Sequence, residues 1–387
     1  MSDPLLFTPL TLRGVTLKNR VVVAPMHQYM AERGYPTDWH LMNIGRYAAG
    51  GAGLVFVEST KVARNGCGTV GDLGLWDDDF IPHFTRLADF IRAHDAVPAI
   101  QLGHSGRKAR RFRPWEGGGP LEPSPEIDDW DDWGLVAPSA LPSGNDDPVP
   151  HELSIGEITD LVEAWGKAAG RANAAGFDVL EIHAAHGYLI HQFLSPKANR
   201  RTDAYGGSNT KRHRFAVEVT EVMRAAWPDD KPLFMRLSVE DDAGWGPAES
   251  VELAKVVKPM GVDVIDCSSG GMLGRPVDGS GPVGYGYQVP YAERLRREAG
   301  VMTMAVGLIV HADQAEEILQ NGRADLVALA REMLYNPNWP MDAAQKLGFD
   351  AEFTSVPAPQ SYWLAKRAAS IKDMVPSTYR PALDKKA

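Results

Sequence analysis

Residues 154–183 read SIGEITDLVEAWGKAAGRANAAGFDVLEIH, and this stretch joins a helix to a strand in one unit. Ser154 and Glu157 have the spacing of a capping box, which satisfies backbone N–H groups at the start of a helix. The helix is expected to end at Gly176, because glycine tolerates the left-handed backbone that follows a helix. The short apolar run over 178–183 then predicts a buried strand. Apolar residues that keep to one face of the helix are Ile158, Leu161, Val162, Trp165, Ala168, Ala169 and Ala172.

The same order of helix and apolar run recurs along the chain. Near-continuous apolar strands that alternate with helices indicate a parallel sheet, and eight such units fit a closed barrel. An open doubly wound sheet usually carries G-x-G-x-x-G after its first strand, and that pattern is missing after Pro25. We therefore expect an α/β fold, a (β/α)8 TIM barrel. Its strands are expected over 20–25, 54–59, 97–102, 178–183, 233–238, 262–267, 301–306 and 326–330.

Two segments depart from this repeat. Residues 7–18 are expected to form an N-terminal β-hairpin that closes the bottom of the barrel. Residues 107–150 are rich in Pro, Gly, Asp and Trp and are too long for a simple turn. Because they follow the third strand, we expect a lid or capping excursion on the active-site side. The domain assignment is one barrel over 1–350, with a C-terminal extension over 351–387 in an oligomer contact.

Composition limits the class of protein. Of the 387 residues, 44% are hydrophobic and 23% are charged, which fits a globular chain with a sizeable core. The net charge of −10 disfavours nucleic acid and anionic membranes as partners. Cys67 and Cys267 are far apart and have no metal-type spacing, which favours a reducing compartment. The chain shows no secretory leader and no apolar run of about 20 residues, so a cytoplasmic location is expected.

The ends of the seventh and eighth strands predict a phosphate site. In barrels, the loops at these ends commonly bind phosphate through backbone N–H groups. Gly307, Ala330 and Arg331 stand there, and Arg331 adds a guanidinium. A phosphate-bearing ligand is therefore expected. The alternative is that Arg331 forms a surface ion pair.

The end of the fourth strand carries His183, His186 and Tyr188. If the chain turns helically after His183, both histidines come to the same side with Tyr188 nearby. Two neutral imidazole donors aimed at one carbonyl oxygen would stabilise an enolate. A phenol would suit proton delivery to the neighbouring carbon. The alternatives are a zinc pair, which lacks obvious further ligands, and packed structural histidines. We expect no metal site.

Longer motifs are spread over nearly the whole chain. They are residues 7–10 (FTPL), 17–20 (LKNR), 100–108 (IQLGHSGRK), 183–196 (HAAHGYLIHQFLSP), 201–208 (RTDAYGGS) and 321–325 (NGRAD), with Arg331 and Glu332 after the last strand. Together they resemble the Old Yellow Enzyme family of flavin ene-reductases, in particular its short-chain bacterial class.

The resemblance implies FMN, bound non-covalently over the barrel mouth, with NADPH or NADH as hydride donor in a ping-pong reaction. It implies that His183 and His186 hold the substrate oxygen and that Tyr188 protonates the substrate, with Tyr29 and His27 as further substrate contacts. Arg236 would lie near flavin N1 and C2=O. The implied cofactor-binding set is Pro25, Met26, His27, Ser59, Gln101, Arg236, Gly307, Ala330 and Arg331.

The chain departs from this class at three places. His27 replaces the usual Cys, and an imidazole beside the flavin should alter both redox potential and pH profile. Ala330 replaces a frequent Gly before Arg331. The C-terminus runs on beyond the segment in which Trp363 or Arg367 would reach a neighbouring subunit. A homodimer or homotetramer is expected from the family.

The expected function is the reduction of electron-poor C=C bonds in small activated alkenes, such as α,β-unsaturated carbonyl or nitro compounds. One alternative is a flavin-dependent amine dehydrogenase or demethylase on the same barrel, although two isolated cysteines disfavour the iron–sulfur cluster of such relatives. Another is a flavin-free barrel lyase of a phosphorylated substrate. Its Schiff-base version would need a lysine at a strand end, and Cys267 and Ser268 end the sixth run. The third is a non-catalytic binding protein.

Overall fold

A closed barrel of parallel strands forms the centre of the computed structural model, which describes residues 3–124, 127–274 and 283–370. Eight strands pair in chain order, and β12 pairs with β3 to close the barrel. The (β/α)8 barrel predicted from the alternating runs is confirmed. The strands are β3 (Val21–Val23), β4 (Leu54–Lys61), β5 (Val97–Gly103), β8 (Val179–Ala184), β9 (Leu233–Ser238), β10 (Val262–Ser268), β11 (Met302–Ala305) and β12 (Leu326–Leu329).

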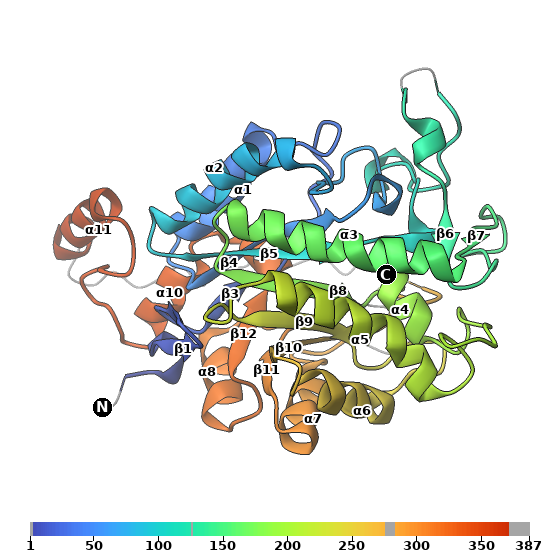
Figure 1. Cartoon of the computed structure of the whole chain (residues 1–387). Coiled ribbons are helices and arrows are strands. Elements are labelled where there is room, and N and C mark those ends of the chain that lie inside the picture. Colours follow the sequence, from blue (N-terminus) through green and yellow to red (C-terminus); the bar gives the residue numbers. More distant parts are fainter. Residues whose placement is uncertain (1–2, 125–126, 275–282, 371–387) are drawn as a thin grey trace, which may run out of the picture.

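Helices follow the strands and cover the outside of the barrel (Figure 1). Ser154 caps α3 as predicted, since its Oγ accepts from the Glu157 N–H at 3.3 Å and its own N–H donates to the Glu157 carboxylate at 2.7 Å. The helices are α1 (Asp38–Ala49), α2 (Ile81–Arg92), α3 (Ile155–Ala174), α4 (Leu189–Leu194), α5 (Asn209–Ala226), α6 (Pro247–Val257), α7 (Val289–Ala299), α8 (Ala312–Gln320), α9 (Arg331–Tyr335), α10 (Trp339–Lys346) and α11 (Ala358–Ser370).

Two buried apolar layers hold the strands in place. One fills the barrel interior and includes Leu54, Phe56 and Phe234. The other lies between strands and helices and includes Trp165. Because both faces of each strand are buried, strand sequences are nearly continuous in apolar residues rather than alternating.

The first strand is shorter than the predicted run over 20–25. Ala24 still donates its N–H to the Leu329 carbonyl at 3.0 Å. The next residue, Pro25, has no N–H and so cannot extend the ladder. The chain therefore leaves the barrel at Pro25, and residues 25–29 form a loop at the carboxyl ends of the strands.

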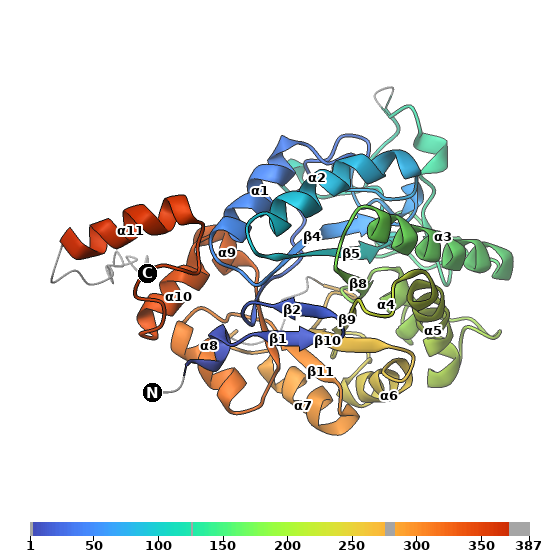
Figure 2. The same cartoon turned by 60° about the vertical axis from the view of Figure 1, so that its left-hand side comes forward.

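The predicted N-terminal hairpin is present as β1 (Leu10–Leu12) and β2 (Val15–Leu17), which pair antiparallel. Figure 2 shows these strands across one end of the barrel. Arg13 ties the hairpin down, with its Nε 2.8 Å from the Asp263 carboxylate. This end of the barrel is thereby closed.

The excursion over 107–150 lies at the opposite end from the hairpin (Figure 1). It holds two short 3-10 turns (Pro114–Glu116 and Trp130–Asp132) and the strand β6 (Val136–Ala137), which pairs with β7 (His151–Glu152). Trp133 is fully buried and donates its Nε1–H to the Cys67 carbonyl at 2.8 Å. Trp133 therefore anchors the excursion, of which residues 125–126 lie outside the described residues.

The C-terminal helix α11 projects from the body of the barrel (Figures 1 and 2). Its Tyr362 and Trp363 are 54% and 67% exposed. Residues 371–387 of the predicted extension lie outside the described residues, and the oligomer contact of Trp363 or Arg367 stays a prediction. No helix in the described part of the chain is long and apolar enough to cross a membrane.

Candidate functional site

Two neighbouring cavities open at the carboxyl ends of the strands. The first has a volume of about 320 Å³ and the second about 280 Å³, and both are lined by His186 and Arg236. They therefore form one elongated site. The first cavity is also lined by Pro25, His27, Tyr29, Gln101, Lys108, His183 and Tyr188, and the second by Ser268, Tyr287, Gln288, Gly307, Ala330 and Arg331 among others.

The turn after β8 brings His183, His186 and Tyr188 together as predicted. The His183 ring lies 5.3 Å from the His186 ring and 4.9 Å from the Tyr188 ring, measured between centroids. The turn requires left-handed backbone at His186 (φ 59°) and Gly187 (φ 71°). A Cβ at Gly187 would overlap the Gly271 carbonyl oxygen, so only glycine fits there.

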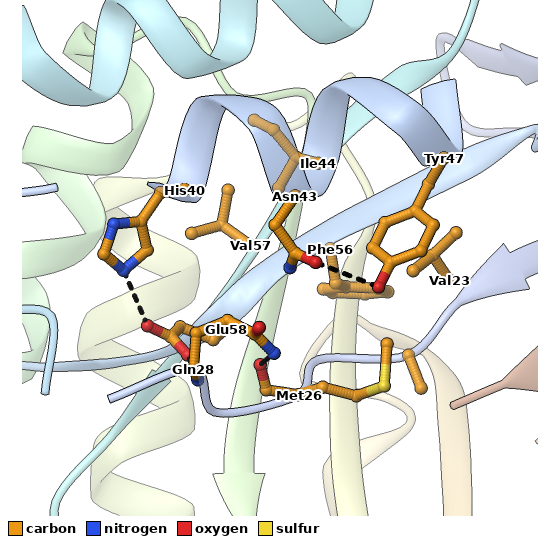
Figure 3. Close-up of a pocket in the computed structure, with 11 residues that line it drawn as sticks. Val23, Met26, Gln28, His40, Asn43, Ile44, Tyr47, Phe56, Val57 and Glu58 are labelled. Atoms are coloured by element: carbon orange, nitrogen blue, oxygen red, sulfur yellow. Dashed lines mark hydrogen bonds and ion pairs between the residues drawn. The ribbon is translucent and has the colours of Figure 1, made fainter. Parts of the chain in front are cut away.

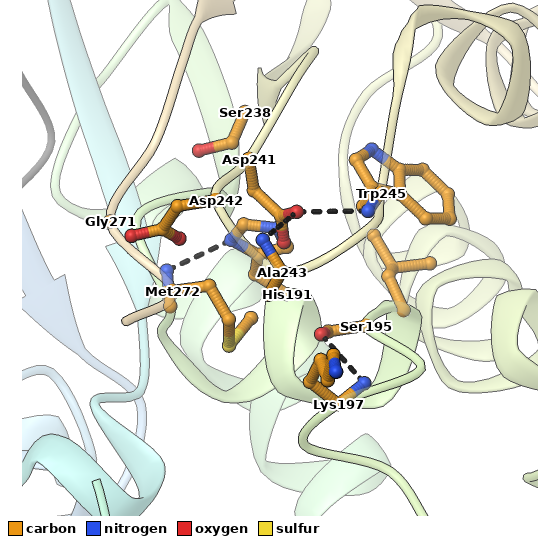
Figure 4. Close-up of polar contacts among 12 residues, drawn as sticks. His191, Ser195, Lys197, Ser238, Asp241, Asp242, Ala243, Trp245, Gly271 and Met272 are labelled. Carbon is orange, nitrogen blue, oxygen red and sulfur yellow. Dashed lines mark hydrogen bonds and ion pairs between the residues drawn. The ribbon is translucent and has the colours of Figure 1, made fainter. Parts of the chain in front are cut away.

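His191 supports this turn, and Figure 4 shows its ring beside Asp241. Its Nδ1 accepts the Gly187 N–H at 2.9 Å, and its Nε2 lies 3.2 Å from the Asp241 carboxylate in a fully buried pair. Burial alone would raise the pKa of Asp241, but its contact with His191 and the hydrogen bonds that it accepts from the Trp245 and Ala243 N–H groups hold that pKa below its ordinary value. Because Nδ1 accepts the Gly187 N–H, the imidazole N–H of His191 is on Nε2, facing Asp241.

The two site histidines are neutral donors. Burial lowers the pKa of His183 and of His186 well below the ordinary value, and the positive charge of Arg236 lowers both further. His183 Nδ1 accepts the Ala185 N–H at 3.3 Å, which leaves the proton on Nε2. His186 Nε2 lies 2.7 Å from Ser268 Oγ, and its Nδ1 has no hydrogen-bond partner among the described residues. His183 Nε2–H is left to donate to a ligand oxygen, and His186 Nδ1–H can do the same when the Ser268 hydroxyl donates to Nε2.

Tyr188 is suited to act as an acid. Burial, followed by the charge of Asp72, raises the pKa of its phenol. The hydroxyl is thus protonated throughout the neutral range, and the residue lines the same cavity as the two histidines. A protonated phenol beside two imidazole donors can deliver a proton to a carbon next to the bound oxygen.

The loop after β3 forms another wall of the first cavity. The His27 ring stacks on Tyr29 with centroids 5.1 Å apart, and Trp115 of the excursion meets Tyr29 edge-on at 5.8 Å. Burial and the nearby charge of Lys61 lower the pKa of His27 to about 4. Both residues line the cavity, and the imidazole that replaces the class's cysteine is neutral there.

Met26 and Ser59 line neither of these two cavities. Met26 lines a separate small cavity with Gln28, Tyr47 and Glu58 (Figure 3), and Ser59 Oγ lies 3.2 Å from Lys61 Nζ. The positions of these two side chains therefore give no support to their predicted cofactor role. The backbone of Met26 is adjacent to Pro25, which does line the first cavity.

A buried pair beneath this loop supports it (Figure 3). His40 Nε2 lies 3.0 Å from Glu58, and the same carboxylate accepts the Gln28 N–H. Gln28 directly follows His27 in the chain. The His40–Glu58 pair therefore holds the loop that carries His27 and Tyr29.

The residues of the predicted phosphate site line the second cavity. Gly307 has φ 109°, and a Cβ there would meet Gln288 Nε2 at 2.8 Å and the Tyr287 ring at 3.0 Å. Glycine is therefore favoured here both by the left-handed backbone and by the close approach of Tyr287 and Gln288. Ala330 and Arg331 line the same cavity. Backbone N–H groups and one guanidinium can bind a phosphate at this position.

A polar layer lies between the two cavities and the apolar barrel interior. Gln101 donates to the Glu181 carboxylate at 2.7 Å, and Arg236 Nε lies 3.2 Å from Asp266 without hydrogen-bond geometry. Burial raises the pKa of both carboxyls, and the charge of Asp266 adds to the effect at Glu181. Sequence reasoning missed Glu181 and Asp266, although an acidic residue within an otherwise apolar strand was the available signal.

Lys108 was also missed as a site residue. Its Nζ donates to the His186 carbonyl at 3.1 Å and to the Gly271 carbonyl, and it lines the first cavity. Burial, followed by the charge of Arg107, lowers its pKa to about 8. Tyr287 and Gln288 were missed because they precede α7, outside the strand ends that were considered.

No group of three or more metal-ligand side chains occurs within residues 3–124, 127–274 and 283–370. Both cysteines are buried and unpaired with each other.

Comparison with known proteins gives consistent matches over most of the chain. The model of the NADH:flavin oxidoreductase / NADH oxidase family matches residues 5–349. A protein named NADPH dehydrogenase from Geobacillus thermodenitrificans (strain NG80-2) is 45% identical over 354 residues, 90% of this chain and 96% of that protein. The structure of morphinone reductase is 28% identical, with a TM-score of 0.74 and coverage of 90% of this chain and 91% of that one.

A larger structural relative is histamine dehydrogenase from Rhizobium sp. 4-9. It is 28% identical with a TM-score of 0.75 over 89% of this chain. The chain spans about half, 48%, of the length of that protein.

Proposed function

Because the chain belongs to the NADH:flavin oxidoreductase / NADH oxidase family, with NADPH dehydrogenases among its relatives, we propose that this NAD(P)H-dependent flavin oxidoreductase reduces electron-poor C=C bonds. Its cofactor is FMN and a nicotinamide nucleotide is its hydride donor. The flavin-free lyase alternative is thereby excluded. The proposal concerns the second substrate, which we infer to be an activated alkene.

The site residues fit FMN. Gly307 and Arg331 line the second cavity together, and a phosphate would bind there to backbone N–H groups and the guanidinium. Arg236 lines both cavities, and its buried Nε, 3.2 Å from Asp266, has no hydrogen-bond partner among the described residues. Gln101, Pro25 and Arg236 would hold the flavin ring. When bound, FMN carries hydride between the nucleotide and the substrate.

The chain's own residues supply the rest of the chemistry. His183 and His186 would donate hydrogen bonds to the activating oxygen of the alkene, so that negative charge developing on it is stabilised. Tyr188 would give its proton to the α-carbon: the phenol O–H bond breaks as the C–H bond forms. Tyr29 and His27 would close the side of the cavity and limit the shape of substrate that enters. The observation that carries the proposal is that two neutral imidazoles and a protonated phenol line one cavity.

Anaerobic visible spectroscopy of the purified protein tests the proposal. NADPH is expected to bleach the flavin band, and 2-cyclohexenone is expected to restore it in the absence of oxygen. The control omits the enone. A flavin that is bleached by NADPH but is restored only by oxygen would contradict alkene reduction.

The amine-oxidising alternative is tested with the same instrument, since histamine dehydrogenase is a structural relative. Histamine added without nucleotide is expected to leave the flavin oxidised. Bleaching by the amine would favour the alternative.

A further inference from the structure

Lys61 is a completely buried lysine beside the proposed acid. It ends β4, and its side chain is 0% exposed. Its Nζ lies 3.2 Å from Ser59 Oγ, 3.5 Å from the Asp72 carboxylate and 5.2 Å from the centre of the Tyr188 ring. A buried ammonium is costly unless it is paired. Its position over the face of the Tyr188 ring has no role in the proposed reduction.

Asp72 is the partner of this lysine and is equally buried. Its carboxylate also accepts the Gly68 N–H at 2.8 Å, the Thr69 N–H at 3.1 Å and the Thr69 hydroxyl at 2.8 Å. Burial alone would raise the pKa of Asp72, but the charge of Lys61 and these hydrogen bonds hold that pKa below its ordinary value. Asp72 is therefore held in its ionised form beside the Lys61 ammonium.

The turn that contains Asp72 also packs on the loop after β3, which lines the first cavity. The turn that Asp72 organises presents the Gly71 carbonyl to the Ala31 N–H at 3.0 Å. A Cβ at Gly71 would overlap the Tyr29 carbonyl, so this turn packs directly on the loop that carries the His27–Tyr29 stack. His27 in turn lies edge-on to Tyr188, with ring centroids 6.4 Å apart.

We propose that the buried Lys61–Asp72 pair sets how readily Tyr188 releases its proton, with Lys61 favouring the transfer and Asp72 opposing it; this rests on the proposed reduction of alkenes. When the phenol O–H bond breaks and the substrate C–H bond forms, Tyr188 keeps the electron pair as a phenolate. The ammonium over the ring face stabilises that charge, and the carboxylate destabilises it. Water in the open cavity then returns a proton to the phenolate. Lys61 acts through Tyr188 and is a positioning residue.

His27 is influenced by the same two charges. Lys61 lowers the pKa of His27 and Asp72 raises it, both acting after the larger effect of burial. Because Lys61 and Asp72 shift the pKa of His27 in opposite directions, removing each should have opposite effects, which a purely structural role of the pair would not produce. Loss of either partner breaks the same ion pair, so a structural role predicts that both losses act alike.

Stopped-flow measurement of the two half-reactions separates the possibilities. The variants are Lys61→Met and Asp72→Asn, each close in shape to the native side chain. Lys61→Met is expected to slow reoxidation by 2-cyclohexenone roughly tenfold or more, a part of what general acid catalysis contributes, and to increase its solvent isotope effect in heavy water. Asp72→Asn is expected not to slow it and to decrease the isotope effect. Reduction by NADPH should change little in either variant.

Three controls complete the experiment. Lys61→Arg keeps the charge and should retain the wild-type isotope effect. Lys231→Met removes a part-buried lysine just before β9, bonded to the Phe177 carbonyl at 2.7 Å at the far end of the barrel, and should leave both half-reactions unchanged. In the FMN-free protein, histidine NMR should show the His27 titration moving up in Lys61→Met and down in Asp72→Asn.

The outcomes distinguish this inference from the proposed function. Equal slowing in Lys61→Met and Asp72→Asn, or no change in either, overturns the inference while alkene reduction stands. If Lys61→Met does not fold, slowing in Asp72→Asn alone overturns it. A wild type that NADPH reduces but 2-cyclohexenone does not reoxidise overturns the proposed function, and the inference with it.

Discussion

The role of His183 as a hydrogen-bond donor depends on which of its ring nitrogens carries the proton. The Ala185 N–H occupies Nδ1 from within the same turn, so the donor is Nε2, and burial keeps the ring neutral. A neutral imidazole gives up no proton when it binds an oxyanion, and it therefore acts as a fixed donor rather than as an acid. Proton transfer is therefore left to Tyr188.

His183→Ala is expected to lower the rate of alkene reduction by roughly 10²-fold, the effect of losing one oxyanion donor. FMN should remain bound, because Gln101, Pro25 and Arg236 would still hold the flavin ring and His183 does not line the second cavity, where the phosphate would bind. Steady-state turnover with 2-cyclohexenone and the flavin-to-protein absorbance ratio check both parts. An unchanged turnover would remove His183 from the mechanism.

Tyr188→Phe is expected to slow reoxidation by the alkene while sparing reduction by NADPH. The reason is that the variant keeps the aromatic ring and removes only the proton that the α-carbon receives. Stopped-flow traces of the separate half-reactions give the comparison. Equal slowing of both would indicate a role in packing rather than in proton transfer.

At the scale of elements, the backbone conformation is more constrained in the connections at the barrel mouth than in the strands. The turn after β11 requires positive φ at Gly307 and Leu308 (φ 48°), and the turn after β8 requires it at His186 and Gly187. Such backbone is costly for most residues and persists where surrounding structure holds it. Both connections line the elongated site, one in each cavity.

Gly307→Ala is expected to weaken FMN binding without unfolding the barrel. The added methyl would meet Gln288 Nε2 at 2.8 Å in the proposed phosphate site, and φ 109° is strained for alanine. Fluorescence titration of FMN-free protein with FMN measures the affinity, and circular dichroism checks the fold. Gly348→Ala is a matched control, because Gly348 also has positive φ (69°) but an added methyl would meet nothing within 4 Å. Equal affinity in the two variants would contradict the assignment.

At the scale of the whole molecule, buried neutral histidines couple stability to pH. Burial lowers the pKa of His27 to about 4 and, with the charge of Lys61, that of His104 to about 3, both from an ordinary value of 6.5. As pH falls below 6.5, these histidines bind protons in the unfolded chain but stay neutral in the folded chain. The free energy of unfolding therefore decreases as pH falls from about 6.5 toward these lower values.

The contribution of one such histidine has a slope of up to about 1.4 kcal/mol per pH unit. His104 is suited to the test because it lines neither cavity of the elongated site. His104→Gln is expected to flatten the decrease in stability by up to that slope, measured by urea unfolding between pH 4.5 and 6.5 at constant FMN. Parallel curves for wild type and variant would show that His104 does not resist protonation.

Local pattern was enough to predict the barrel and most of its active end. A strand buried on both faces must be apolar along its length, so all eight strands are visible as runs, and parallel strands bring their carboxyl ends to one side. His183, His186 and Tyr188 are close in sequence, which is why their grouping could be predicted without the fold. Gly307 and Arg331 could be placed because each follows a strand end.

The tertiary structure alone decided which distant residues meet. Lys61 reaches Tyr188, and Lys108 reaches the Gly271 carbonyl, across separations that no periodicity encodes. Met26 turns into a separate small cavity because the chain leaves β3 at Pro25, and its position beside His27 in sequence does not reveal this. A pattern of apolar residues reports whether a side chain is buried. The partner of a buried charge is set only when the barrel closes and brings remote side chains within a few ångströms.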